Sequence, residues 1–131
     1  MSGPFELQLR AFAEKAKSNA DLVVRKCVLD VGAELISRSP VATGRFRSNW
    51  FYALDRSYTG VTQDTGVDGV RDLGSMPGKA IGHVHTITNN VPYALRLEDG
   101  YSKQAPNGMV GLTVQRWQSI VSAAAAEVRA Q

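Results

Sequence analysis

The sequence is poor in the residue types on which most enzymes, secreted domains and membrane proteins depend. It contains one cysteine and two histidines among 131 residues, so no disulfide can form within the chain and histidine chemistry has few candidates. The apolar helical neighbours of Cys27 predict a buried hydrophobe. No apolar run approaches the roughly 20 residues of a membrane-spanning helix, and the first residues lack the layout of a secretory signal. We therefore expect no membrane contact and a protein that stays in the cytoplasm where it is made.

The sequence also lacks a strong charge of one sign. It has 15 Lys and Arg against 12 Asp and Glu, a net charge of +3, and residues 51–100 carry six acidic and four basic residues. A DNA-binding protein normally gathers Lys and Arg on one surface, which makes that function a less favoured alternative. The length and an average composition, 44% hydrophobic and 21% charged, predict a single domain over residues 1–131.

What the sequence does contain is a long helical pattern near its start. Apolar residues recur every three or four positions from Phe5 to Leu35, which places them on one stripe of a helix. Ser39-Pro40 ends the pattern, so a helix is predicted over residues 4–38. At 1.5 Å per residue it is about 52 Å long, against a diameter of roughly 36 Å for a domain of this size. A break near Ser18-Asn19 into two shorter helices is the alternative.

The remaining segments predict a small sheet and further helices. Residues 50–54 and 83–89 have the alternation and β-branched content of strands. Residues 92–99 predict a short helix, and residues 117–128 an Ala-rich one. Residues 55–82 show no periodicity and hold six of the twelve glycines. The predicted fold class is α+β: a long N-terminal helix and a C-terminal helix packed on a small antiparallel sheet, with a long Gly-rich loop between its strands.

Three patterns fall short of a chemical site. The segment Gly74–Ala80 has three residues between its glycines and ends in alanine where a phosphate-binding loop needs a hydroxyl. His83 and His85 share one face of a strand, without a third ligand at a recognisable spacing. Glu98 and Asp99 point about 100° apart on a helix and are interpreted as its solvated end. We therefore predict a protein that is not an enzyme, with no catalytic or metal-binding residues and no cofactor.

Three sequence blocks occur in an order that is typical of one family. They are Ser39-Pro40-Val41-x-Thr43-Gly44-Arg45-x-Arg47-x-x-Trp50, Asn89-Asn90-Val91-Pro92-Tyr93-Ala94-x-x-Leu97-Glu98-x-Gly100 and Gln104-Ala105-Pro106-x-Gly108-Met109-Val110. With its flanking helices, the chain resembles the tail-completion or neck protein family of long-tailed bacteriophages, the group of lambda-type minor tail protein Z. The resemblance covers nearly the whole chain, and the Gly-rich insertion between the strands departs from it.

The resemblance implies a non-catalytic virion protein at the head-tail junction, made in the host cytoplasm. Such a protein completes the tail and joins it to the DNA-filled head as a homo-oligomeric ring, a hexamer matching tail symmetry. Genomic DNA passes through the ring without sequence recognition. The implied partners are head-closure or connector proteins and tail-tube or terminator proteins. A tail terminator or another neck subunit is the alternative.

Seven residues are predicted to make interface contacts. Phe5 and Leu9 begin the apolar stripe that is longer than the domain. Three acidic residues of the Gly-rich loop are expected to meet Arg45 and Arg47 of an adjacent subunit, namely Asp64, Asp68 and Asp72. Ordering the loop, residues 58–82, costs about 1 kcal/mol or more per residue in backbone entropy. The loop is therefore predicted to order only when the ring meets its partners.

Overall fold

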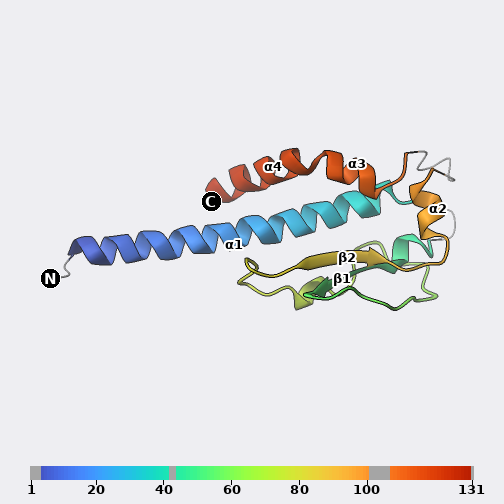
Figure 1. Cartoon of the computed structure of the whole chain (residues 1–131), viewed down its shortest axis with the longest axis horizontal. Coiled ribbons are helices and arrows are strands. Elements are labelled where there is room, and N and C mark those ends of the chain that lie inside the picture. Colours follow the sequence, from blue (N-terminus) through green and yellow to red (C-terminus); the bar gives the residue numbers. More distant parts are fainter. Residues whose placement is uncertain (1–3, 42–43, 101–106, 131) are drawn as a thin grey trace.

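One uninterrupted helix, α1 (Pro4–Arg38), forms the axis of the molecule (Figure 1). The structure is a computed structural model that describes residues 4–41, 44–100 and 107–130, without the side chains of residues 4–17. It confirms the predicted helix, and the alternative break near Ser18-Asn19 does not occur. At the end of α1 the Ser39 hydroxyl donates to the Leu35 carbonyl at 2.6 Å, and Pro40 disfavours a further helical residue before it.

Two antiparallel strands, β1 (Trp50–Leu54) and β2 (His85–Asn89), form the sheet. Trp50 pairs with Asn89, and Leu54 pairs with His85. β1 has the predicted bounds, whereas β2 begins two residues later than predicted. The reason is that His83 and Val84 approach the Asp55 carboxylate outside the strand, and Val84 donates its backbone N–H to it at 2.8 Å.

The segment between the strands returns along the other edge of β1. The Arg71 N–H donates to the Trp50 carbonyl and the Tyr52 N–H donates to the Arg71 carbonyl, both at 2.9 Å. A 3-10 helix, Leu73–Ser75, follows. The Gly-rich loop therefore contributes one residue to the sheet edge, and its backbone groups are partly satisfied within the chain.

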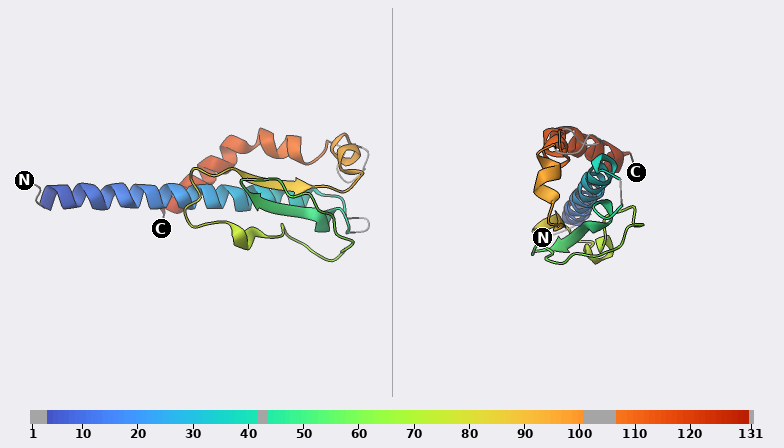
Figure 2. Two further views of the ribbon diagram at one scale, coloured as in Figure 1. Left: turned by 60° about the horizontal axis from the view of Figure 1, so that its bottom comes forward. Right: turned by 90° about the vertical axis from the view of Figure 1, so that its right-hand side faces the viewer.

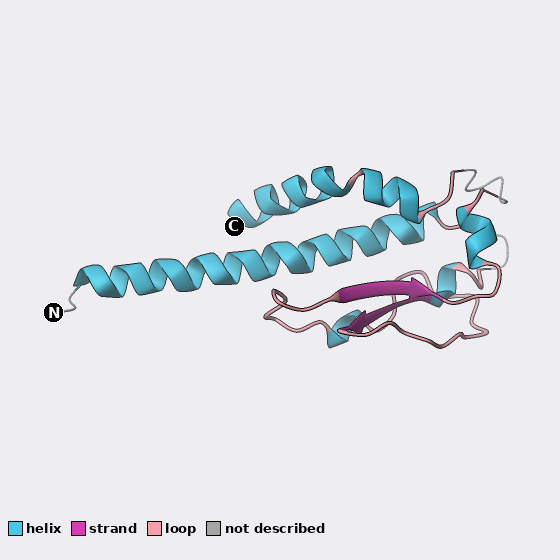
Figure 3. Cartoon of the chain, viewed as in Figure 1, coloured by secondary structure: helices cyan, strands magenta, loops and turns pink. Residues whose placement is uncertain are grey.

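Three shorter helices complete the chain, α2 (Ala94–Glu98), α3 (Val110–Gln115) and α4 (Trp117–Arg129). α3 and α4 lie along one side of α1, and the sheet lies on the other side (Figures 1 and 2). Figure 3 shows the resulting mixture of helices and a two-stranded sheet. The α+β class is as predicted, with α1 in the middle of three layers.

Two groups of buried side chains hold these layers together. The first joins the end of α1 to the sheet and α2, and comprises Leu35, Ile36, Phe46, Trp50, Val91 and Met109. The second joins α1 to α4, and comprises Cys27, Ile120 and Ala124. Val31 packs against both groups. Cys27 is buried as predicted, and this burial raises the pKa of its thiol.

Candidate functional site

The sequence blocks that carry the resemblance meet at one end of the molecule. Phe46 and Trp50 of the first block, Val91 of the second and Met109 of the third belong to one buried cluster with the end of α1. The Phe46 and Trp50 rings pack edge to face at 5.5 Å, and the Trp50 indole donates to the Ser39 hydroxyl at 2.8 Å. The blocks therefore form a common core. Thr43 and residues 104–106 of the blocks lie outside the described residues.

Three glycines of the blocks, Gly44, Gly100 and Gly108, have backbone angles that other residues resist. Gly44 has a φ of +78° and Gly100 a φ of +90°. A Cβ atom on Gly44 would also collide with the Thr65 carbonyl oxygen of the Gly-rich loop. Both the conformation and the close approach of the loop therefore require glycine at position 44.

Glu98 is a structural anchor, and its interpretation as part of a solvated helix end is wrong. Its carboxylate accepts the backbone N–H groups of Met109, Val110 and Gly111 at 2.9, 2.8 and 3.0 Å. Burial raises the pKa of this carboxyl, but the three N–H donors together lower it by more, so the net pKa is below its ordinary value. Glu98 therefore joins the second block to the start of α3.

Ser48 and Asn49 attach the Gly-rich loop to the core, a role that the sequence analysis missed. Both are fully buried at the end of the 3-10 helix Arg47–Asn49. The Asn49 side chain donates to the Thr62 carbonyl at 3.1 Å and accepts the Thr62 N–H at 2.8 Å. Ser48 accepts the Val67 N–H at 3.0 Å. The sequence did contain a signal for this role, because Ser48 and Asn49 stand between Phe46 and the apolar residues of β1. Polar residues buried at such a place need hydrogen-bond partners.

Two of the three acidic loop residues that are predicted to contact an adjacent subunit lie beside arginines of their own chain. Arg47 lies 3.3 Å from Asp68. Asp64 accepts a bond from Arg71 at 2.6 Å, which lowers the pKa of its carboxyl. Asp72 is exposed and adopts a left-handed backbone angle before the 3-10 helix. Asp64 and Asp68 therefore have partners within the chain, and their contacts with an adjacent subunit stay a prediction.

An aromatic stack also covers the loop side of β1. The rings of Phe51 and Tyr58 stack at 3.9 Å, and the Arg71 guanidinium lies 5.4 Å from the Phe51 ring centre. Asn90 donates to the Tyr58 carbonyl at 2.7 Å. Both faces of β1 are thereby covered. The chain itself therefore supplies contacts that hold part of the loop.

The two histidines are held by structural hydrogen bonds. His83 bonds to the Asp55 carboxylate at 2.8 Å, and His85 bonds to the Tyr52 hydroxyl at 2.7 Å. The Val84 N–H, and then His83, hold the pKa of Asp55 below its ordinary value. No three His, Cys, Asp or Glu side chains among the described residues are placed to hold a metal ion.

The Gly74–Ala80 segment is bonded to side chains of α1 and β2. Met76 and Ala80 are buried, and the Arg25 guanidinium donates to the Pro77 carbonyl at 3.0 Å. The Ala80 carbonyl bonds to the His85 ring at 2.8 Å. Two carbonyls of this segment are thus bonded to side chains of the same chain, and Met76 and Ala80 pack into the fold.

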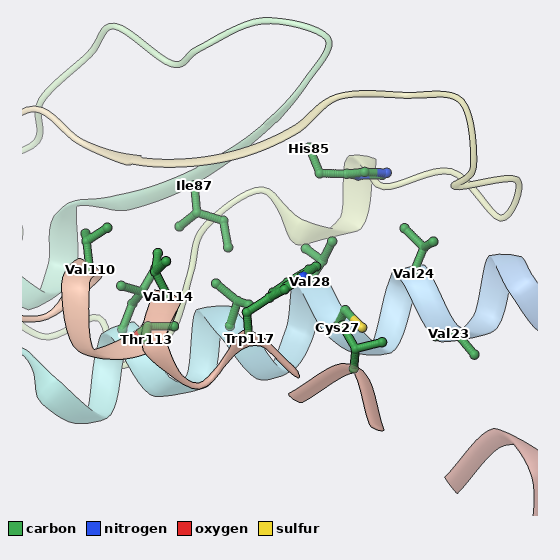
Figure 4. A pocket seen from close by; sticks show the side chains of 13 residues that line it. Val23, Val24, Cys27, Val28, His85, Ile87, Val110, Thr113, Val114 and Trp117 are labelled. Carbon is green, nitrogen blue, oxygen red and sulfur yellow. The ribbon is translucent and has the colours of Figure 1, made fainter. Parts of the chain in front are cut away.

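An apolar groove of about 550 Å³ lies between α1, β2 and the α3–α4 arm (Figure 4). Its floor is α1, from Val23 to Leu35, and its polar or ionisable lining residues are Cys27, Thr113 and His85. Val114 and Trp117 line the groove with 65% and 50% of their surfaces exposed. The helical pattern of residues 117–128 does not distinguish Trp117 from the buried positions of the same helix. Helical spacing shows which residues share a face, but not how far the neighbouring layer covers that face.

Comparisons of the chain with protein-family models, with curated proteins and with solved structures find no match. The resemblance to tail-completion proteins consequently rests on the three sequence blocks. In the described part of the chain, no helix combines the length and apolar character of a membrane span. The side chains of Phe5 and Leu9 lie outside the described residues, and their backbone belongs to the first turns of α1.

Proposed function

We propose that the chain is a non-catalytic structural subunit of the head-tail junction of a long-tailed bacteriophage virion. It completes the tail and joins it to the head as a ring, a hexamer in this proposal, around the DNA channel. The observation that supports this most is the packing of the three family-like blocks into one cluster through Trp50, Val91 and Met109. Residues that build one core together are expected to persist together in a family of one fold.

The shape of the molecule favours an assembly role. Residues 4–17 of α1 extend beyond both the sheet and α4 (Figures 1 and 2), and an extended helix reaches neighbours that a compact domain cannot. A ring of identical subunits needs two different contact surfaces on each one. His83, His85 and Glu98 are each hydrogen-bonded to other groups of the fold, and the groove that His85 lines is formed mainly by apolar side chains. This arrangement favours a non-catalytic subunit.

A nonsense mutation in the gene, within the phage or prophage that carries it, tests the proposal. We expect electron micrographs to show DNA-filled heads and finished tails of normal length that do not join. Purified protein added to the lysate should restore joining and infectivity. Tails of abnormal length would favour the alternative of a tail terminator. Normal joined particles without the protein would reject both.

A further inference from the structure

The apolar groove is open to solvent, so it is more than a packing defect inside the core. The exposed faces of Val114 and Trp117 and the floor from Val23 to Val31 form one continuous apolar lining. Sites of this kind bind an amphipathic helix by its apolar stripe, through anchors at helical spacing. The groove therefore suits a helix with apolar residues along one narrow face and polar residues on the opposite face.

The projecting part of α1 has this character. In the sequence, Phe5, Leu9, Phe12 and Ala16 follow each other at intervals of four, three and four residues. Charged residues (Glu6, Arg10, Glu14 and Lys15) and three further apolar ones (Leu7, Ala11 and Ala13) stand between them. From Phe5 to Ala16 a helix rises about 17 Å, and the groove floor from Val23 to Leu35 spans about 18 Å. The two lengths match.

The segment cannot occupy the groove of its own chain. α1 is continuous from Pro4 to Arg38, and residues of the same helix form the groove floor. Folding residues 4–17 back would require α1 to break, and such a kink normally needs proline, a Gly/Ser pair or a bulge. The occupant that fits is the same segment of a second copy.

We propose that the apolar groove binds residues 4–17 of α1 from a second copy of this chain, in a head-to-tail contact. Each copy then offers a helix to one neighbour and a groove to another. Such contacts form a closed ring when the rotation between copies closes, and a filament when it does not. The identification of this ring with the virion neck rests on the proposed function, whereas the contact itself rests on the groove and the helix.

Cross-linking between two single-cysteine variants tests the contact directly. In a Cys27→Ala background, Leu9→Cys protein is mixed with Val114→Cys protein and treated with a short bismaleimide reagent. A covalent dimer between the two variants is expected. The matched control replaces Val114→Cys by Ser119→Cys, an exposed position on the adjoining helix that does not line the groove. No Leu9–Val114 dimer, or an equal yield with Ser119→Cys, would overturn the proposal.

Charge substitutions test the contact in the otherwise unmodified chain. Val114→Glu and Leu9→Glu should each weaken self-association at least tenfold in sedimentation velocity. Val84→Glu is the matched control, because Val84 is 64% exposed, close to the 65% of Val114, and does not line the groove. Melting curves should show that Val114→Glu remains folded. Unchanged association of both groove-contact variants would overturn the inference.

The same variants separate this inference from the proposed function. If Val114→Glu abolishes self-association while the variant still joins heads to tails in the complementation assay, that result supports the groove contact and rejects the proposed function of the ring. If the wild-type protein joins heads to tails but the Leu9→Cys and Val114→Cys variants give no cross-linked dimer, the proposed function is supported and the groove contact is rejected.

Discussion

Asn49 shows how one side chain can hold a long loop. It is fully buried, and its amide donates to the Arg45 and Thr62 carbonyls and accepts the Thr62 N–H. Truncation would remove these three hydrogen bonds at a partly buried site. Buried groups that lose their partners cost more than the net gain of an average hydrogen bond.

We therefore expect Asn49→Ala to lower the free energy of unfolding by roughly 2 to 4 kcal/mol. Urea unfolding followed by circular dichroism measures this change. Asn107→Ala is the matched control, since Asn107 is exposed, and surface substitutions usually change stability by less than about 0.5 kcal/mol. Equal small effects of both substitutions would show that the loop is not held by Asn49.

Glu98 makes stability depend on acid in a predictable direction. The three N–H donors lower the pKa of its carboxyl below the ordinary value of 4.5 in the folded chain. The unfolded chain then takes up the proton first as the pH falls. The stabilisation by Glu98 is complete above the pKa that this carboxyl has in the unfolded chain. It is lost as the pH decreases through the lower pKa that the carboxyl has in the folded chain.

Glu98→Gln should therefore cost about 1 to 3 kcal/mol at neutral pH, because a neutral amide is a weaker acceptor than a carboxylate. The difference from the wild type should vanish in strong acid. Melting temperatures over a pH series measure both effects. The neighbouring exposed residue gives the control, since Asp99→Asn should leave the acid profile in place. A constant difference at every pH would contradict this role for the Glu98 charge.

At the scale of elements, the Gly-rich loop gives the largest difference between sequence and structure. Its six glycines and lack of periodicity predicted a segment without partners in its own chain. The groups that hold it lie elsewhere in the sequence, on Ser48, Asn49 and Asn90. Local patterns indicate what a segment can bury by itself, and they do not show which distant side chains bond to its backbone.

α1 and β1 were predictable for the opposite reason, whereas α3 was not predicted. α1 and β1 have the predicted bounds, because apolar spacing, Pro40 and aromatic alternation act within a few residues. The groove could not be predicted, since it depends on how α3, α4 and β2 stand around α1. The role of Glu98 was missed because its partners follow a connection of ten residues.

Hydrogen exchange of the isolated protein tests whether the loop is held without neighbours. We expect slow exchange at the amides of Thr62, Val67 and Arg71, which donate to Asn49, Ser48 and the Trp50 carbonyl. Exposed Gln63 and Gly66 provide fast-exchanging references within the same segment. Uniformly fast exchange from residue 58 to residue 82 would restore the earlier prediction that the loop orders only in the assembly.

At the scale of the whole molecule, α1 separates two cores of unequal size. The cluster toward the sheet contains six buried residues, and the cluster toward α4 contains three. Val31 packs against both. Because stability is not uniform across a structure, the side with fewer buried contacts should open at lower free energy. We therefore expect the α3–α4 arm to detach from α1 while the sheet remains folded.

Two substitutions of the same kind on opposite sides of α1 test this expectation. Ile120 and Ile36 are 4% and 7% exposed, and they belong to the smaller and the larger cluster. Replacing either buried isoleucine by alanine costs about 2 to 5 kcal/mol. Ile120→Ala should speed amide exchange in α4 and leave β1 and β2 protected, whereas Ile36→Ala should speed exchange in the strands as well. Equal loss of protection throughout in both variants would mean that the molecule unfolds as one unit.

Since Trp117 and Val121 of α4 line the groove, Ile120→Ala should also weaken self-association, even though Ile120 itself does not line it.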